Sequence, residues 1–165
     1  MTQNFLSQNM KRLSFIIFFL LCTQFSSAQS VSKSDSLQVM VAMEKVFRNF
    51  ESPGFSEFQK IATEEIWCLV CDGALNSEYG PYKIRSKEFY DTYLKNISDS
   101  GYWKRAAKSS EIRLQKVKNS SDSITAFITI WNKNEYAPGH EGAELGIHFR
   151  KIDRSFKFSG IETIP

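Results

Sequence analysis

The side chains best suited to acid–base chemistry in this chain are Glu162, Asp72 and His140. Apolar and polar residues alternate near the C-terminus, and a regular alternation puts Glu162 on the same side as Phe156 and Phe158. A carboxyl group at the rim of an apolar cavity has its pKa raised by burial, as a general acid or base working near neutral pH requires. His140 could share that proton, and Asp72 is a second carboxylate candidate.

Each of these three residues also has an ordinary structural interpretation. Glu162 lies close to the C-terminus, where chains usually reach water, and His140 lies in a loop with Pro138 and Gly139. Asp72 precedes a glycine, a pair that is first of all a turn signal. Because these interpretations are the simpler ones, we assign no catalytic residue.

A pocket for a largely apolar ligand needs a few polar anchors, and five residues are candidates. These ligand-binding candidates are Trp67, Tyr90, Tyr93, Asn132 and Glu162. The three aromatic residues offer indole and hydroxyl donors. The alternation of apolar and polar residues places Asn132 at the same end of the sheet as Glu162. The alternative is that aromatic residues at helical spacing belong to the core.

The chain lacks the residue patterns that identify zinc sites, phosphate-binding loops and Gly-x-Ser-x-Gly nucleophiles. It has only two histidines, and no spacing of His, Cys or carboxylates resembles a zinc site. There is no glycine-rich phosphate loop and no Gly-x-Ser-x-Gly motif. We therefore expect no metal and no cofactor.

Cys68 and Cys71 follow Trp67 in a W-C-x-x-C pattern that resembles the thioredoxin active site. In thioredoxin-like proteins this motif opens a helix, whereas residues 65–71 favour a strand. Residues i and i+3 of a strand lie about 10 Å apart, beyond the reach of a disulfide. We predict two buried thiols in a strand, with a redox motif as the alternative.

The spacing of apolar residues predicts three helices and then a four-stranded meander. The helices are expected over residues 35–50, 55–62 and 86–97, with a strand at 65–71 between the second and the third. Alternation from residue 111 onward predicts strands at 111–118, 124–133, 143–152 and 155–164. The expected fold class is α+β, with helices on one apolar face of a curved antiparallel sheet.

The last two strands form the clearest hairpin. A turn at Asp153 puts Phe149 opposite Phe158 and Ile147 opposite Gly160, so that their shared face is apolar. His148 then falls on the other, outer face.

The outer face of the sheet is predicted to be an interface. Phe127 and Trp131 alternate with buried residues and fall beside His148. An exposed aromatic patch of this kind favours a homodimer. The alternative is a monomer with two surface aromatics.

Residues 1–28 have the composition of a signal peptide. Lys11 and Arg12 precede an apolar run at 13–22 that is too short to span a bilayer, and small residues end at Ala28. Residues 29–165 then form a single domain in an exported protein, periplasmic or secreted. Without the two leader cations the formal charge of +3 falls close to neutral, which argues against nucleic acid as a partner. No membrane association is expected after cleavage.

The order of these elements resembles that of the nuclear transport factor 2-like, or SnoaL-like, superfamily. The resemblance rests on the first helix, on the strand around Trp67, and on the hairpin strands that carry Phe149, Phe156 and Phe158. It implies a cone-shaped sheet closed by helices, with a cavity for a small, largely apolar molecule. It also implies two alternatives: an isomerase, lyase or hydrolase that uses a pocket carboxylate, and a protein–protein interaction module.

Overall fold

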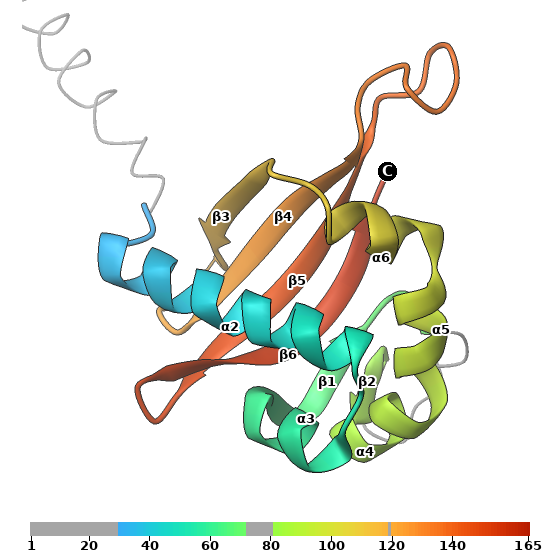
Figure 1. Cartoon of the computed structure of the whole chain (residues 1–165). Helices are drawn as coiled ribbons and strands as arrows, with labels where there is room; N and C mark the ends of the chain where they lie inside the picture. The colour runs from blue at the N-terminus through green and yellow to red at the C-terminus, as the bar shows by residue number, and fades with distance from the viewer. Residues whose placement is uncertain (1–29, 72–80, 119) are drawn as a thin grey trace, which may run out of the picture. The chain divides into compact units, whose positions relative to one another are not determined.

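The computed structural model describes residues 30–71, 81–118 and 120–165 (Figure 1). The chain divides into two units, Met1–Ser30 and Val31–Pro165, and the description below concerns the second. The proposed leader and Asp72 lie outside the described residues.

Helices cover one face of a curved, six-stranded sheet (Figure 1). The helices are α2 (Lys33–Glu51), α3 (Phe55–Ile61), α4 (Ser86–Glu88), α5 (Leu94–Asp99) and α6 (Gly101–Ala106), with a π-helical turn, Phe89–Tyr93, between α4 and α5. The strands are β1 (Ala62–Cys68), β2 (Lys83–Arg85), β3 (Ile112–Lys116), β4 (Ser123–Trp131), β5 (Ala143–Ile152) and β6 (Ser155–Ile164). The α+β class is confirmed, and β5 and β6 have the bounds that the sequence predicts.

The sheet is mixed, not purely antiparallel as predicted. Its strand order is β2-β1-β6-β5-β4-β3, and β1 pairs with β6 in parallel while the other pairs are antiparallel. The prediction missed β2, which pairs with β1 through only three residues, and it missed the short helix α6. Strands and helices this short give too little periodicity to be recognised.

The long helix α2 is fixed at its start by a cap and by an ion pair. The Ser32 hydroxyl accepts a hydrogen bond from the backbone N–H of Asp35 at 3.0 Å, which satisfies one free donor of the first turn. The Asp35 carboxylate in turn accepts from Lys151 of β5 at 2.7 Å, and this contact lowers the pKa of Asp35. The helix predicted over residues 35–50 corresponds to α2, which begins slightly earlier.

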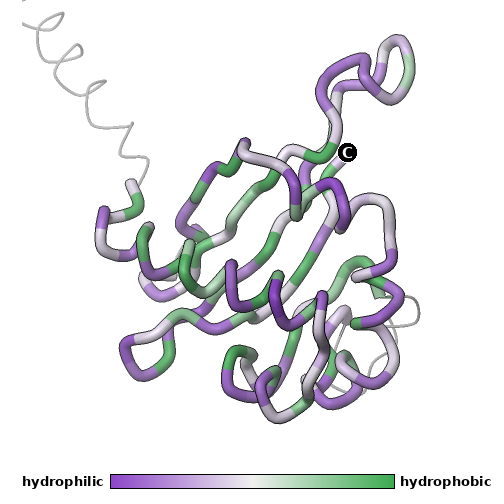
Figure 2. Tube along the Cα trace, in the orientation of Figure 1, coloured by the Kyte–Doolittle hydropathy of each residue, from purple (hydrophilic) through white to green (hydrophobic). Residues whose placement is uncertain are grey.

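Phenylalanine rings fill the space between the helices and the sheet. Phe50 of α2, Phe58 of α3 and Phe89 of the π-helical turn meet Phe158 of β6, with ring centroids 5.5–6.2 Å from Phe158. All four are fully or almost fully buried. Hydrophobic residues recur along α2 and the central strands in Figure 2. The cavity expected here beneath the helices is therefore occupied by the protein's own side chains.

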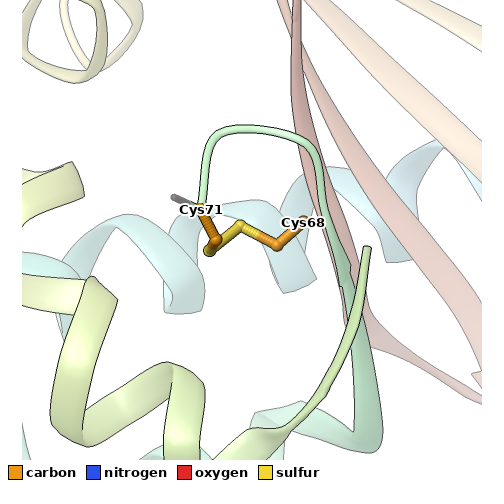
Figure 3. Close-up of a disulfide and its surroundings, with 2 residues drawn as sticks. All are labelled: Cys68 and Cys71. Carbon is orange, nitrogen blue, oxygen red and sulfur yellow. A yellow bond between two sulfur atoms is a disulfide. The ribbon is translucent and has the colours of Figure 1, made fainter. Parts of the chain in front are cut away.

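Cys68 and Cys71 form a disulfide, contrary to the prediction of two free thiols (Figure 3). Strand β1 ends at Cys68, and Leu69 and Val70 turn the chain, so the two Cα atoms lie only 5.5 Å apart. The predicted strand continued to residue 71, and that error produced the larger separation. Both cysteines are buried, and the bond closes the turn at the end of β1.

We expect the double variant Cys68→Ala/Cys71→Ala to fold and to lose about 2 kcal/mol of unfolding free energy, because a bond that closes so short a loop restricts the unfolded chain only modestly. Urea denaturation of the wild type with and without reductant, beside the variant, measures this. Alkylation of both residues in the untreated, unfolded protein would contradict the disulfide.

Candidate binding groove on the outer sheet face

A β-bulge in β6 places Glu162 on the outer face of the sheet, not on the helix side as predicted. Phe149 lies opposite Phe158 as expected, but the register shifts between His148 and Phe149, so that Ile161 and not Gly160 lies opposite Ile147. The extra residue is Ser159, which has no partner on β5. Beyond it the alternation is inverted, so Ile161 is buried and Glu162 faces outward.

Two glycines make room for the outward side chains. Gly160 lies opposite His148 on one side and Trp67 on the other, and a Cβ there would lie 2.6 Å from the Trp67 carbonyl oxygen. The rings of Trp67 and His148 meet edge to face across it, with centroids 4.9 Å apart. Gly146 lies opposite Glu162, and a Cβ there would lie 2.8 Å from Glu162 Cγ. The glycines therefore allow contacts that any other residue would block.

His148 and Glu162 form a largely buried pair on this face. The Nε2 atom of His148 lies 3.2 Å from Glu162 Oε1, and the two side chains are 18% and 17% exposed. Thr125 holds the ring from the opposite side, with its Oγ1 atom 2.8 Å from Nδ1. This contact is not a hydrogen bond, so the buried Nε2 has no hydrogen-bond partner among the described residues.

Burial favours the uncharged form of both groups. It lowers the pKa of His148 to about 4 and raises the pKa of Glu162 above its ordinary value. His148 is therefore neutral at pH 7, with Nε2 available to donate or accept one proton. A carboxyl group of raised pKa beside it can supply or remove that proton, which is the arrangement of an acid–base pair.

These residues line a cavity of about 550 Å³ that opens on the outer face of the sheet. We call it the outer groove. Trp67 and Phe127 supply aromatic surface, Thr125, His148 and Glu162 supply polar groups, and Arg150 lies farther along β5. Charged side chains of Glu65, Lys83, Lys116 and Lys118 also line the groove. Sites for small molecules likewise combine apolar area with polar groups.

Four other predicted residues lie outside this groove. Tyr90 packs against Phe55 and Phe58 among the helices, and Tyr93 is half-buried in the same helical layer. In the loop after β4, the Asn132 backbone N–H and side-chain amide both donate to Glu135, and His140 Nδ1 accepts from the N–H of Gly142.

The predicted grouping of Trp67 with the tyrosines, and of Glu162 with Asn132 and His140, is therefore wrong. The bulge in β6 sends Glu162 to the opposite face from the helices, where Trp67 also lies.

Of the predicted interface residues, Phe127 and His148 share the outer groove, whereas Trp131 lies elsewhere. The pairing of β4 with β5 shifts between Thr129 and Trp131, which ends the regular alternation. The Trp131 ring contacts Tyr136, with centroids 5.8 Å apart, and the Arg105 guanidinium at 5.3 Å. Trp131 therefore does not form one aromatic patch with Phe127.

Sequence reasoning missed Thr125 and the two glycines as parts of a site. Glycines within strands, next to polar residues on neighbouring strands, were the available signal, because they mark a close approach of other groups.

Within residues 30–71, 81–118 and 120–165, no group of three or more His, Cys, Asp or Glu side chains is arranged to hold a metal ion. No helix in those ranges has the length and apolar character needed to span a membrane.

Comparison with known proteins finds similar structures but no similar sequences. No protein-family model and no curated protein matches the chain. A protein of unknown function with a cystatin-like fold from Nostoc punctiforme has 12% identity and a TM-score of 0.45, over 83% of this chain and 96% of its own. An NTF2-like protein of unknown function from Shewanella baltica has 9% identity and a TM-score of 0.39, over 83% and 99%.

A de novo designed protein with a curved β-sheet has 11% identity and a TM-score of 0.41, over 79% of this chain and 99% of its own. None of these likenesses bears on family, ligand or reaction.

We expect His148 to remain neutral until the pH falls to about 4. In the unfolded chain the same ring takes up its proton near pH 6.5, so this residue makes stability fall as the pH drops from 6.5 to 4. The raised pKa of Glu162 acts in the opposite sense, because the folded protein then keeps a proton that the unfolded chain has already released.

The His140→Gln variant leaves one histidine, whose ring NMR signals should titrate with a midpoint near 4. Between pH 7 and pH 4.5 the wild type should lose about 2 kcal/mol more unfolding free energy than His148→Gln. A midpoint near 6.5 would show that the ring is open to water.

Proposed function

We propose that this protein binds a small, largely apolar molecule in the outer groove. The observation that carries the proposal is the polar pair His148–Glu162 set between the aromatic side chains of Trp67 and Phe127. The ligand's apolar body covers the two aromatic surfaces, and one polar group of the ligand hydrogen-bonds to Nε2 of His148, which has no hydrogen-bond partner among the described residues. This site replaces the cavity that the sequence suggested beneath the helices, where phenylalanine rings now lie.

We also propose that the protein is exported and belongs to the nuclear transport factor 2-like superfamily. The disulfide between Cys68 and Cys71 supports export, because structural disulfides persist in oxidising compartments. The order of elements supports the superfamily: α2 and α3, then β1, then a helical segment, then the meander β3 to β6.

The neutral probe 2-naphthamide tests the groove by isothermal titration calorimetry. We expect the affinity for the probe to fall about tenfold in Trp67→Ala, because the contact between the indole ring and the probe is lost. Trp131→Phe is the matched control, since that ring lies outside the groove, and it should bind as the wild type does.

Equal binding by Trp67→Ala and the wild type would place the probe elsewhere. Sedimentation could instead show that the protein without ligand is a dimer and that Phe127→Ala is a monomer. This face would then be the contact between two copies of the chain.

A second candidate function is acid–base catalysis by Glu162 with His148. The close, largely buried contact between the two groups favours it, because a desolvated carboxylate is a stronger base than one in water. Such a pair suits an isomerase, lyase or hydrolase that moves one proton to or from a small substrate.

The probe 5-nitrobenzisoxazole tests this candidate, because a base that removes its carbon-bound proton opens the ring and releases a coloured nitrophenolate. We expect a rate that rises with pH as Glu162 ionises and that falls at least about tenfold in Glu162→Gln. Glu57→Gln, an exposed residue of α3, is the control. An unchanged rate in Glu162→Gln would remove Glu162 as the base.

A further inference from the structure

Two cations lie directly opposite each other at one end of the outer groove. Arg150 of β5, which lines the groove, pairs in register with Lys157 of β6 on one side and Ser123 of β4 on the other. All three lie on the outer face, because their neighbours Phe149 and Phe158 are buried on the helix side. Like charges placed directly opposite on neighbouring strands repel each other, so this pairing is unfavourable by itself.

Neither cation forms an ion pair with any residue that the structure describes. Two other cations on the same sheet have carboxylate partners. Lys151, next to Arg150, binds the Asp35 carboxylate at 2.7 Å on the helix side, and Arg113 on the outer face binds Glu144 at 2.8 Å. Arg150 and Lys157 are thus two adjacent positive charges without a counter-ion among the residues that the structure describes.

The distance between this pair and the aromatic part of the groove sets the size of a ligand that could reach both. Arg150 follows His148 by two residues on the same face of β5, a separation of about 7 Å along the strand. Trp67 contacts His148 from β1, so an aromatic ring placed there lies within one short molecule's length of the cations.

We propose that the outer groove selects amphipathic anions, with the apolar body against Trp67 and Phe127 and a carboxylate, sulfonate or phosphate head bound by Arg150 and Lys157. The proposal rests on the function proposed above and adds the charge class and orientation of the ligand. The anion neutralises the apposed cations, and a planar carboxylate suits the fork of the Arg150 guanidinium.

The test compares 2-naphthoate with its neutral analogue 2-naphthamide by calorimetry at pH 7.5 and low salt. We expect the anion to bind about tenfold more tightly, and the difference to shrink as salt is added. In Arg150→Gln/Lys157→Gln the two probes should bind equally. Lys60→Gln removes a positive charge on α3 and should keep the preference.

The outcomes separate the two proposals. If neither probe binds, the proposed small-molecule site fails and the anion preference fails with it. If both bind equally to the wild type, the site stands and the anion preference is wrong. If the double variant keeps the preference, the anion is held elsewhere and the assignment to Arg150 and Lys157 is wrong.

Thermal unfolding without ligand provides an independent readout. Because the apposed cations repel each other, Arg150→Gln and Lys157→Gln should each leave the midpoint unchanged or raise it. A lowered midpoint in both would show that the cations already have partners in the protein, which would overturn the proposal.

Discussion

Close packing of phenylalanine rings fills the space between the helices and the sheet of this protein. Phe50, Phe58 and Phe89 converge on Phe158, and each ring contacts the others from a different element. Opening a cavity there would mean removing a ring, at about 3–5 kcal/mol for a buried phenylalanine. These rings stabilise the interior and leave no cavity at their centre, and the outer groove lies on the side of the sheet that the helices leave uncovered.

The shape of the outer groove depends on two glycines, which carry no side chain, as well as on the side chains that line it. Gly146 and Gly160 lie in the middle of strands, where glycine weakens the sheet by offering nothing to pack. Here each glycine is opposite a polar residue, Glu162 and His148 respectively, which then lies flat against the strand. The two polar side chains are thus largely buried, and burial lowers the pKa of His148 and raises the pKa of Glu162.

Most of the fold could be predicted because long, regular patterns determine it. Helix α2, the meander from β3 to β6 and the pairing of Phe149 with Phe158 all follow from periodicity. Two features could not be predicted, because each depends on a departure from periodicity. The disulfide depends on the turn after Cys68, which brings the cysteines together. The candidate site depends on the single extra residue in β6, which inverts the side to which Glu162 belongs.

The bulge at Ser159 also bears on how the groove tolerates a change in strand length. An added or lost residue in a regular strand moves every later side chain to the other face of the sheet, whereas a bulge absorbs the extra residue. Removing Ser159 would leave Gly160 opposite His148, Ile161 buried opposite Ile147 and Glu162 outward opposite Gly146, in a strand without a bulge. In this fold, a single insertion or deletion at Ser159 can therefore change the length of β6 while the acidic group of the groove keeps its side of the sheet.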